Sequence, residues 1–285
     1  MFMVHVHKIE MQAGDAFALA DAAHPPRTCN DEPHVDYIDM SFTDRGADSI
    51  LEAIVARPPE APFAYIVTPN VDHLVRLHHS RSDLWPTYRA AWMTLCDSRI
   101  LARLARRMGC ALPVIPGSDL TRMMFDQVIG TDDRIAIVGG QPELVASLAK
   151  RYGLTDVQHY NPPMGFINQA FEVAKAAAFL KRARARYNFI ALGSPQQEML
   201  AYKVARAGGA TGIGLCVGAS LDFLTGKEER APLIMQQMCL EWLFRLSSNP
   251  RRMWRRYLID GPGIFPIERR WRLTHPRETL DDVGG

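Results

Sequence analysis

The chain has 285 residues, of which 47% are apolar, 22% charged and 9% aromatic. These proportions exclude wholesale disorder and fibrous repeats, and the length allows one large domain or two small ones. The five scattered cysteines include no C-x-x-C pair, so neither a disulfide framework nor a zinc knuckle is indicated. A net charge of only +2 gives little reason to expect nucleic acid as a partner.

The N-terminal segment combines a short alternating run at 2–7 with a polar, proline-containing stretch. We expect residues 1–35 to form a peripheral arm or hairpin. The segment lacks the basic and apolar regions of a secretory signal, so we expect the protein to stay in the cytoplasm. No run reaches about 18 consecutive apolar residues, and no membrane-spanning helix is predicted.

Residues 36–231 alternate short apolar runs, turn residues and helical patterns. The predicted strands lie near residues 63–67, 92–96, 134–138, 157–160, 188–192 and 213–217. The predicted helices lie near residues 71–79, 99–108, 119–129, 142–152, 168–184 and 195–206. Strands that alternate with helices of this length are typical of a mostly parallel sheet covered on both faces. The sequence therefore predicts a Rossmann-like, doubly wound α/β core.

In such sheets, ligands bind at the residues directly after the strands. Asp97 follows the second predicted strand, where a carboxylate can accept a proton from a substrate hydroxyl. The alternative is that Asp97 only caps the helix after it. Glycine-containing turns follow later strands, and they either serve as tight turns or let backbone amides approach a phosphate. No G-x-G-x-x-G or Walker sequence is present, so a dinucleotide oxidoreductase has weak support.

The segment 232–285 changes to a helix-on-helix pattern and is strongly basic. Between Arg245 and Arg277 it holds nine arginines and two acidic residues, with aromatic and aliphatic side chains interleaved at near-helical spacing. Most basic runs are solvated faces, but this interleaving favours a helical appendage on an anionic membrane surface. The chain has no D-x-D motif, and its histidine pairs lack carboxylate or cysteine partners. We therefore expect arginines rather than a metal to stabilise a leaving diphosphate.

Seven motifs between about residues 66 and 258 resemble, in this order, the WecG/TagA/CpsF family of bacterial glycosyltransferases. They are TPN (68–70), CDS (96–98), PGSDL (116–120), IVGG (137–140), LGSPQQE (192–198), VGASLDFLTGKEERAP (217–232) and LEWLFRLSSNPRRMWRRYL (240–258). The last three are the most specific. The family usually has glycine after the aspartate of its A-D-G motif, whereas this chain has Ser98, which leaves the identity of the donor open.

The resemblance implies an inverting glycosyltransferase at the cytoplasmic face of the inner membrane. It would move a hexose or N-acetylhexosamine from a UDP-sugar to a polyprenyl-diphosphate-linked sugar in surface polysaccharide or exopolysaccharide assembly. It implies Asp97 as the catalytic base, with no cofactor and no metal. The alternative is a non-catalytic scaffold that binds UDP or a lipid diphosphate, and formation of a homo-oligomer stays open.

The resemblance and the strand-end turns also give the remaining site residues. The predicted donor-binding residues are Thr68, Asn70, Gly139, Gly140, Gly193, Pro195, Gln196, Gln197, Gly218 and Asp222. The predicted diphosphate or membrane contacts are Arg245, Arg252 and Arg255, which share one helical side if Pro250 does not break the helix.

Overall fold

A six-stranded parallel sheet forms the centre of the computed structural model, which describes residues 33–226, 235, 238, 241–248 and 250–275, without the side chains of 241, 245 and 252. The strand order is β4-β3-β8-β7-β5-β6, and every pairing in this sheet is parallel. The strands are β3 (Ala64–Val67), β4 (Met93–Thr94), β5 (Ile135–Gly139), β6 (Val157–Tyr160), β7 (Tyr187–Ala191) and β8 (Ile213–Cys216). The predicted α/β fold class is confirmed.

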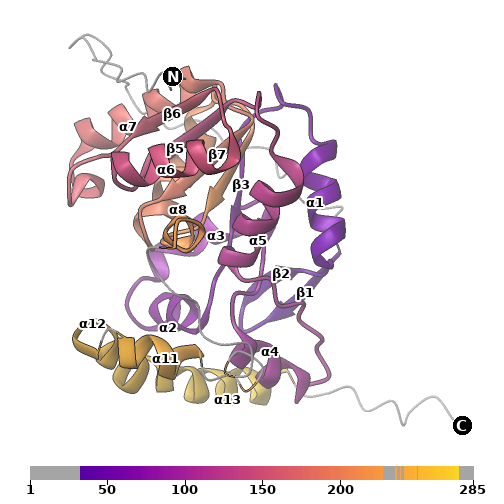
Figure 1. Ribbon diagram of the computed structural model, residues 1–285. Coiled ribbons are helices and arrows are strands. Elements are labelled where there is room, and N and C mark those ends of the chain that lie inside the picture. Colours follow the sequence, from indigo (N-terminus) through magenta and orange to yellow (C-terminus); the bar gives the residue numbers. More distant parts are fainter. Residues whose placement is uncertain (1–32, 227–234, 236–237, 239–240, 249, 276–285) are drawn as a thin grey trace, which may run out of the picture.

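Helices cover both faces of the sheet (Figure 1). On β3, the side chains of Tyr65 and Val67 enter one apolar core and that of Ile66 enters the other, because successive strand residues point to opposite faces. The first core also holds α2 (Val71–His79), α3 (Trp85–Arg89), α7 (Ala170–Ala183) and α8 (Gln196–Ala207). The second holds α1 (Ala47–Ala56), α5 (Gly117–Met123), α6 (Pro142–Tyr152) and α9 (Ser220–Leu224).

The predicted and observed bounds agree for α2, α6 and β6. The predicted helix at 119–129 begins earlier, as α5, and continues as the π-helical turn η2 (Met124–Val128). The edge strand β4 is shorter than predicted, and only an isolated bridge between Cys96 and Val114 extends the pairing there. Short 3-10 turns complete this part of the fold at η1 (Ser82–Leu84) and η3 (Phe166–Asn168).

A two-stranded hairpin before the sheet was not predicted. Strands β1 (His34–Tyr37) and β2 (Met40–Thr43) pair antiparallel through a two-residue turn. Ile38 and Asp39 both have positive φ there, as the favoured two-residue hairpin turn requires. The Thr43 hydroxyl accepts a hydrogen bond from the backbone of Thr94 at 3.1 Å, which ties the hairpin to the sheet edge. The arm expected at 1–35 lies almost entirely outside the described residues, and the predicted domain boundaries remain predictions.

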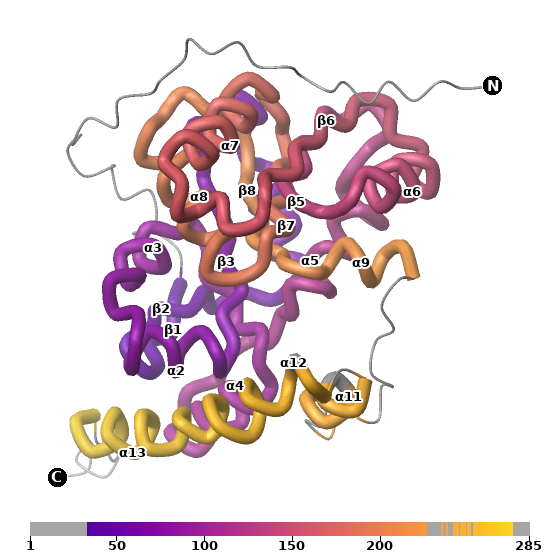
Figure 2. The backbone as a smooth tube through the Cα atoms, turned by 90° about the vertical axis from the view of Figure 1, so that its left-hand side faces the viewer, coloured from indigo at the N-terminus to yellow at the C-terminus, as the bar shows by residue number. Residues whose placement is uncertain are grey.

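The C-terminal helices run in a line along one end of the molecule, below α2 and α4 (Arg99–Arg106), as Figure 2 shows. They are α11 (Glu241–Ser248), α12 (Pro250–Trp254), η4 (Arg255–Asp260), η5 (Gly261–Gly263) and α13 (Ile264–Thr274). We call the segment 241–274 the appendage. Ile264 and Ile267 are buried in the core beside α2, and the Trp271 ring meets that of Tyr37 edge-on at 5.2 Å. Within the described residues, no helix is long and apolar enough to cross a membrane.

Pro250 is the first residue of α12, a position to which proline is well suited because it lacks a backbone N–H. Arg245 lies in α11 and Arg252 in α12, and residue 249 between these elements lies outside the described residues. The single helical side expected for the three arginines therefore remains a prediction.

Candidate active site

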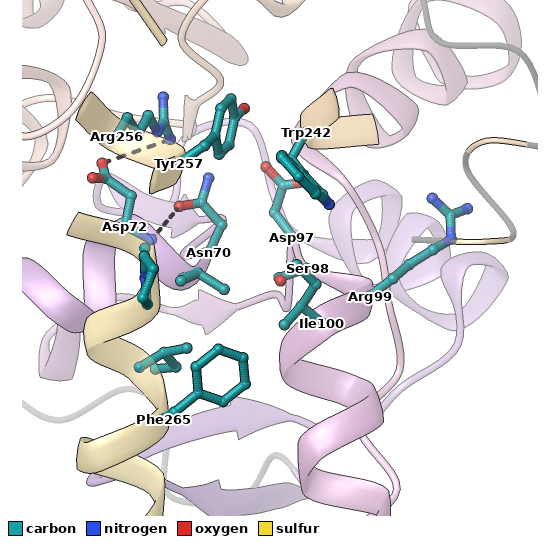
Figure 3. A pocket seen from close by; sticks show the side chains of 14 residues that line it. Asn70, Asp72, Asp97, Ser98, Arg99, Ile100, Trp242, Arg256, Tyr257 and Phe265 are labelled. Carbon is teal, nitrogen blue, oxygen red and sulfur yellow. Dashed lines mark hydrogen bonds and ion pairs between the residues drawn. The ribbon is translucent and has the colours of Figure 1, made fainter. Parts of the chain in front are cut away.

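A cavity of about 310 Å³ lies between the N-terminal ends of α2 and α4 and the appendage (Figure 3). Its polar residues include Asn70 and Asp97, which follow the neighbouring strands β3 and β4. The appendage contributes mainly aromatic and basic groups to the opposite wall. Those side chains are Trp242, Arg256, Tyr257 and Phe265. The cavity thus combines two segments that are about 150 residues apart in the sequence.

Asp97 lies at the carboxyl end of β4, where the sequence predicts it, with Leu95 and Cys96 between it and the strand. Its backbone N–H donates to the carbonyl of Pro69 at 3.0 Å, which joins the turns after the two strands. Its carboxylate points into the cavity between Asn70 and Trp242 (Figure 3). The helix-capping role considered for Asp97 belongs instead to Ser98, whose hydroxyl accepts a hydrogen bond from the backbone of Leu101 at 3.2 Å. Serine at this position therefore has a structural reason, since it starts α4.

Asn70 caps α2 and lines the same cavity. Its side-chain oxygen accepts a hydrogen bond from the backbone N–H of Asp72 at 3.1 Å and lies 2.8 Å from Nδ1 of His73. The backbone N–H of Asn70 also meets that nitrogen, at 3.2 Å. The amide nitrogen of Asn70 is directed away from these contacts, toward the side of Tyr257 (Figure 3).

A buried polar chain connects Asn70 to the turns after β7 and β8. His73 Nε2 lies 3.5 Å from Oε1 of Glu198, and Gln197 Nε2 donates to the same oxygen at 2.9 Å. Gln197 Oε1 accepts the backbone N–H of Gly218 at 2.8 Å. Burial by itself raises the pKa of Glu198, but the hydrogen bonds from His73 and Gln197 and the charge of His73 outweigh it and lower the pKa overall. Gln197, predicted near the donor, is therefore a buried structural link.

The other predicted donor residues lie elsewhere on this sheet edge. Thr68 is buried behind the cavity, with its hydroxyl 3.4 Å from the carbonyl of Cys216. Gly139 has φ of +95°, and a Cβ there would lie 2.5 Å from the carbonyl oxygen of Ala191, so only glycine fits this turn. The remaining predicted residues follow β5, β7 and β8 and do not line the cavity; they are Gly140, Gly193, Pro195, Gln196, Gly218 and Asp222.

Among the predicted arginines, the structure describes the side chain of Arg255 alone. That side chain is largely exposed and lies 4.0 Å from Asp260. The side chains of Arg245 and Arg252 lie outside the described residues. Arg256, the next residue along, lines the cavity, and sequence reasoning missed it. The run of arginines signalled a cation here, but it did not show which of two adjacent residues faces inward.

Asp72 is a second residue that sequence reasoning missed. Its carboxylate lies 3.6 Å from Arg256 of the appendage and 3.4 Å from Arg76 on its own helix. Arg76 in turn donates to the hydroxyl of Ser194 at 2.6 Å, in the turn after β7. The ion pair with Arg256 therefore joins the appendage to the two strand-end turns.

A doubly covered parallel sheet with a carboxylate, an amide and an arginine in one cavity at its carboxyl edge defines an α/β enzyme with a small-molecule site. The family model described as Glycosyl transferase WecG/TagA/CpsF family matches residues 35–278. The chain belongs to this family and is a glycosyltransferase of cell-surface polysaccharide synthesis. Within the described residues, no group of three or more His, Cys, Asp or Glu side chains is placed to hold a metal.

Proposed function

We propose that the protein is an inverting glycosyltransferase that moves a hexose or N-acetylhexosamine from a UDP-sugar to a polyprenyl-diphosphate-linked sugar. The observation that carries this proposal is the position of Asp97, whose carboxylate faces a cavity closed by the basic, aromatic appendage. The family membership supports sugar transfer and a lipid-linked acceptor. The UDP donor and the inverting outcome rest on the resemblance of the motifs.

In the proposed reaction, Asp97 is the general base. It takes the proton from an acceptor hydroxyl as that oxygen attacks the anomeric carbon of the donor. The bond from this carbon to the diphosphate breaks in the same displacement, so the configuration inverts and UDP leaves with the electron pair. Positive charge at the leaving oxygens lowers the barrier. Arg256 can supply this charge, because it lines the cavity that holds Asp97.

The appendage also supports the proposal that the protein acts at the cytoplasmic face of the inner membrane. Trp254, Leu258 and Ile259 are exposed although they are large and apolar, and Arg255 beside them is exposed as well. Apolar side chains mixed with arginines favour binding to an anionic lipid surface. We propose that the appendage binds there, where a polyprenyl-linked acceptor is held, and that arginines stabilise the leaving group without a metal.

The test is release of UDP by the purified protein from a panel of UDP-sugars, in EDTA, with a lipid-diphosphate monosaccharide in liposomes. We expect acceptor-dependent release that Asp97→Asn lowers by about 10²- to 10⁴-fold, the usual contribution of a general base. Asp132→Asn is the matched control, since that side chain is exposed in a turn away from the cavity. UDP binding without release from any donor would favour the non-catalytic scaffold, and full activity of Asp97→Asn would remove the proposed base.

A further inference from the structure

The orientation of the Asn70 amide follows from its hydrogen bonds. The backbone N–H of Asp72 requires an acceptor, so the oxygen of the amide must face the first turn of α2. Nδ1 of His73 meets the same oxygen at 2.8 Å. Both contacts hold the oxygen away from the cavity and turn the NH₂ group toward it (Figure 3). Asn70 thus offers a hydrogen-bond donor on the cavity side that also holds the carboxylate of Asp97.

His73 can hold this oxygen only if its ring is fixed. The imidazole is 7% exposed and packs edge-on against the ring of Tyr88. Its Nε2 faces Glu198, which is 1% exposed and can only accept at Oε1 when ionised. Nε2 therefore donates to Glu198. In the imidazolium form Nδ1 also carries a hydrogen and donates it to the Asn70 oxygen, whereas in the neutral form Nδ1 accepts the backbone N–H of Asn70, so the ring contacts Asn70 in both forms. A carboxylate behind a histidine fixes ring orientation in this way in many sites.

Glu198 is itself fixed by groups from two further strand ends. It lies in the first turn of α8, after β7, and accepts a hydrogen bond from the side-chain nitrogen of Gln197. The side-chain oxygen of Gln197 accepts the backbone N–H of Gly218 after β8. Three neighbouring strands of the sheet, β3, β8 and β7, thus contribute to one buried chain that ends at the Asn70 amide. Burying the Glu198 carboxylate costs free energy, which its contacts with His73 and Gln197 offset.

We propose that His73, held by Glu198, is a positioning residue that orients the Asn70 amide so that its NH₂ group meets the substrate beside Asp97. This inference rests on the proposed function, because it requires that Asn70 touch the substrate. A misplacement of a positioned group by about 1 Å can cost about 10²-fold in rate, so a residue that acts only through Asn70 has a measurable effect.

A double-mutant cycle tests the inference, with kcat/KM for transfer and the Kd for UDP measured for each protein. Asn70→Asp keeps the capping oxygen but removes the NH₂ donors, and His73→Leu removes both ring contacts. We expect each single variant to lose about 10- to 100-fold in kcat/KM, and the double variant to be no worse than Asn70→Asp alone. His78→Leu, on the same helix but outside the buried chain, is the matched control and should keep wild-type activity.

Two additions separate positioning from general damage. His73→Asn keeps an amide nitrogen near the place of Nδ1, and we expect it to recover part of the activity that His73→Leu loses. Melting temperatures identify any variant that is simply unfolded. Equal losses from His73→Leu in the wild-type and Asn70→Asp backgrounds would overturn the inference. A wild type that binds UDP but transfers no sugar counts against the proposed function. The coupling between His73 and Asn70 is then calculated from the Kd for UDP of the four proteins.

Discussion

Ile264 is the most deeply buried of the apolar side chains that attach the appendage to the core. It is 1% exposed at the start of α13, among core residues beside α2. Replacing a buried isoleucine with alanine costs about 2–5 kcal/mol, through lost apolar contact and the cavity left behind. At 1.4 kcal/mol per factor of ten, this shifts the equilibrium between docked and undocked α13 by about 30-fold to several thousand-fold. Ile264→Ala should therefore favour undocking of α13 from the cavity without altering Asp97.

Hydrogen exchange by mass spectrometry measures this opening directly. In Ile264→Ala we expect exchange of the α13 amides to rise by the calculated factor, while the amides of β5 stay protected. Leu273→Ala is the control, because Leu273 lies on the same helix and is 75% exposed, so its loss should stay within about 0.5 kcal/mol. Unchanged exchange of α13 in Ile264→Ala would refute the reasoning, as would equal acceleration of α13 and β5, which indicates global unfolding.

Two further predictions concern the carboxyl edge of the sheet. Gly139→Ala should lower the melting temperature far more than Gly165→Ala. Both glycines have positive φ, which costs alanine about 1–2 kcal/mol, but only at Gly139 would the added Cβ also meet a carbonyl oxygen. Similar shifts of the melting temperature in the two variants would show that the turn after β5 adapts. The lowered pKa of Glu198 stabilises the fold at pH values above its ordinary pKa of 4.5, and this contribution is lost as the pH falls through the folded value. Urea melts between about pH 6 and pH 3.5 should thus show a steeper loss for wild type than for Glu198→Gln, and parallel profiles would contradict this.

The sequence by itself determined the elements of the sheet and the edge where ligands bind. The strand expected at 157–160 and the helix expected at 142–152 became β6 and α6 with the predicted bounds, because such patterns are a local property of the sequence. The hairpin at 34–43 was missed although its strands alternate, since two short strands give a weak signal. Asp97 was placed at the carboxyl edge correctly because the turn that follows a parallel strand lies there.

Only the tertiary structure decided which distant residues meet. Nothing in the sequence pairs His73 with Glu198, because their contact depends on β3 and β7 lying on either side of β8. Likewise, whether Arg255 or Arg256 faces the cavity depends on how η4 docks, and a shift of one residue turns a side chain by about 100° around a helix. Periodicity specifies elements, but the packing of elements far apart in the chain selects the side chains that share a cavity.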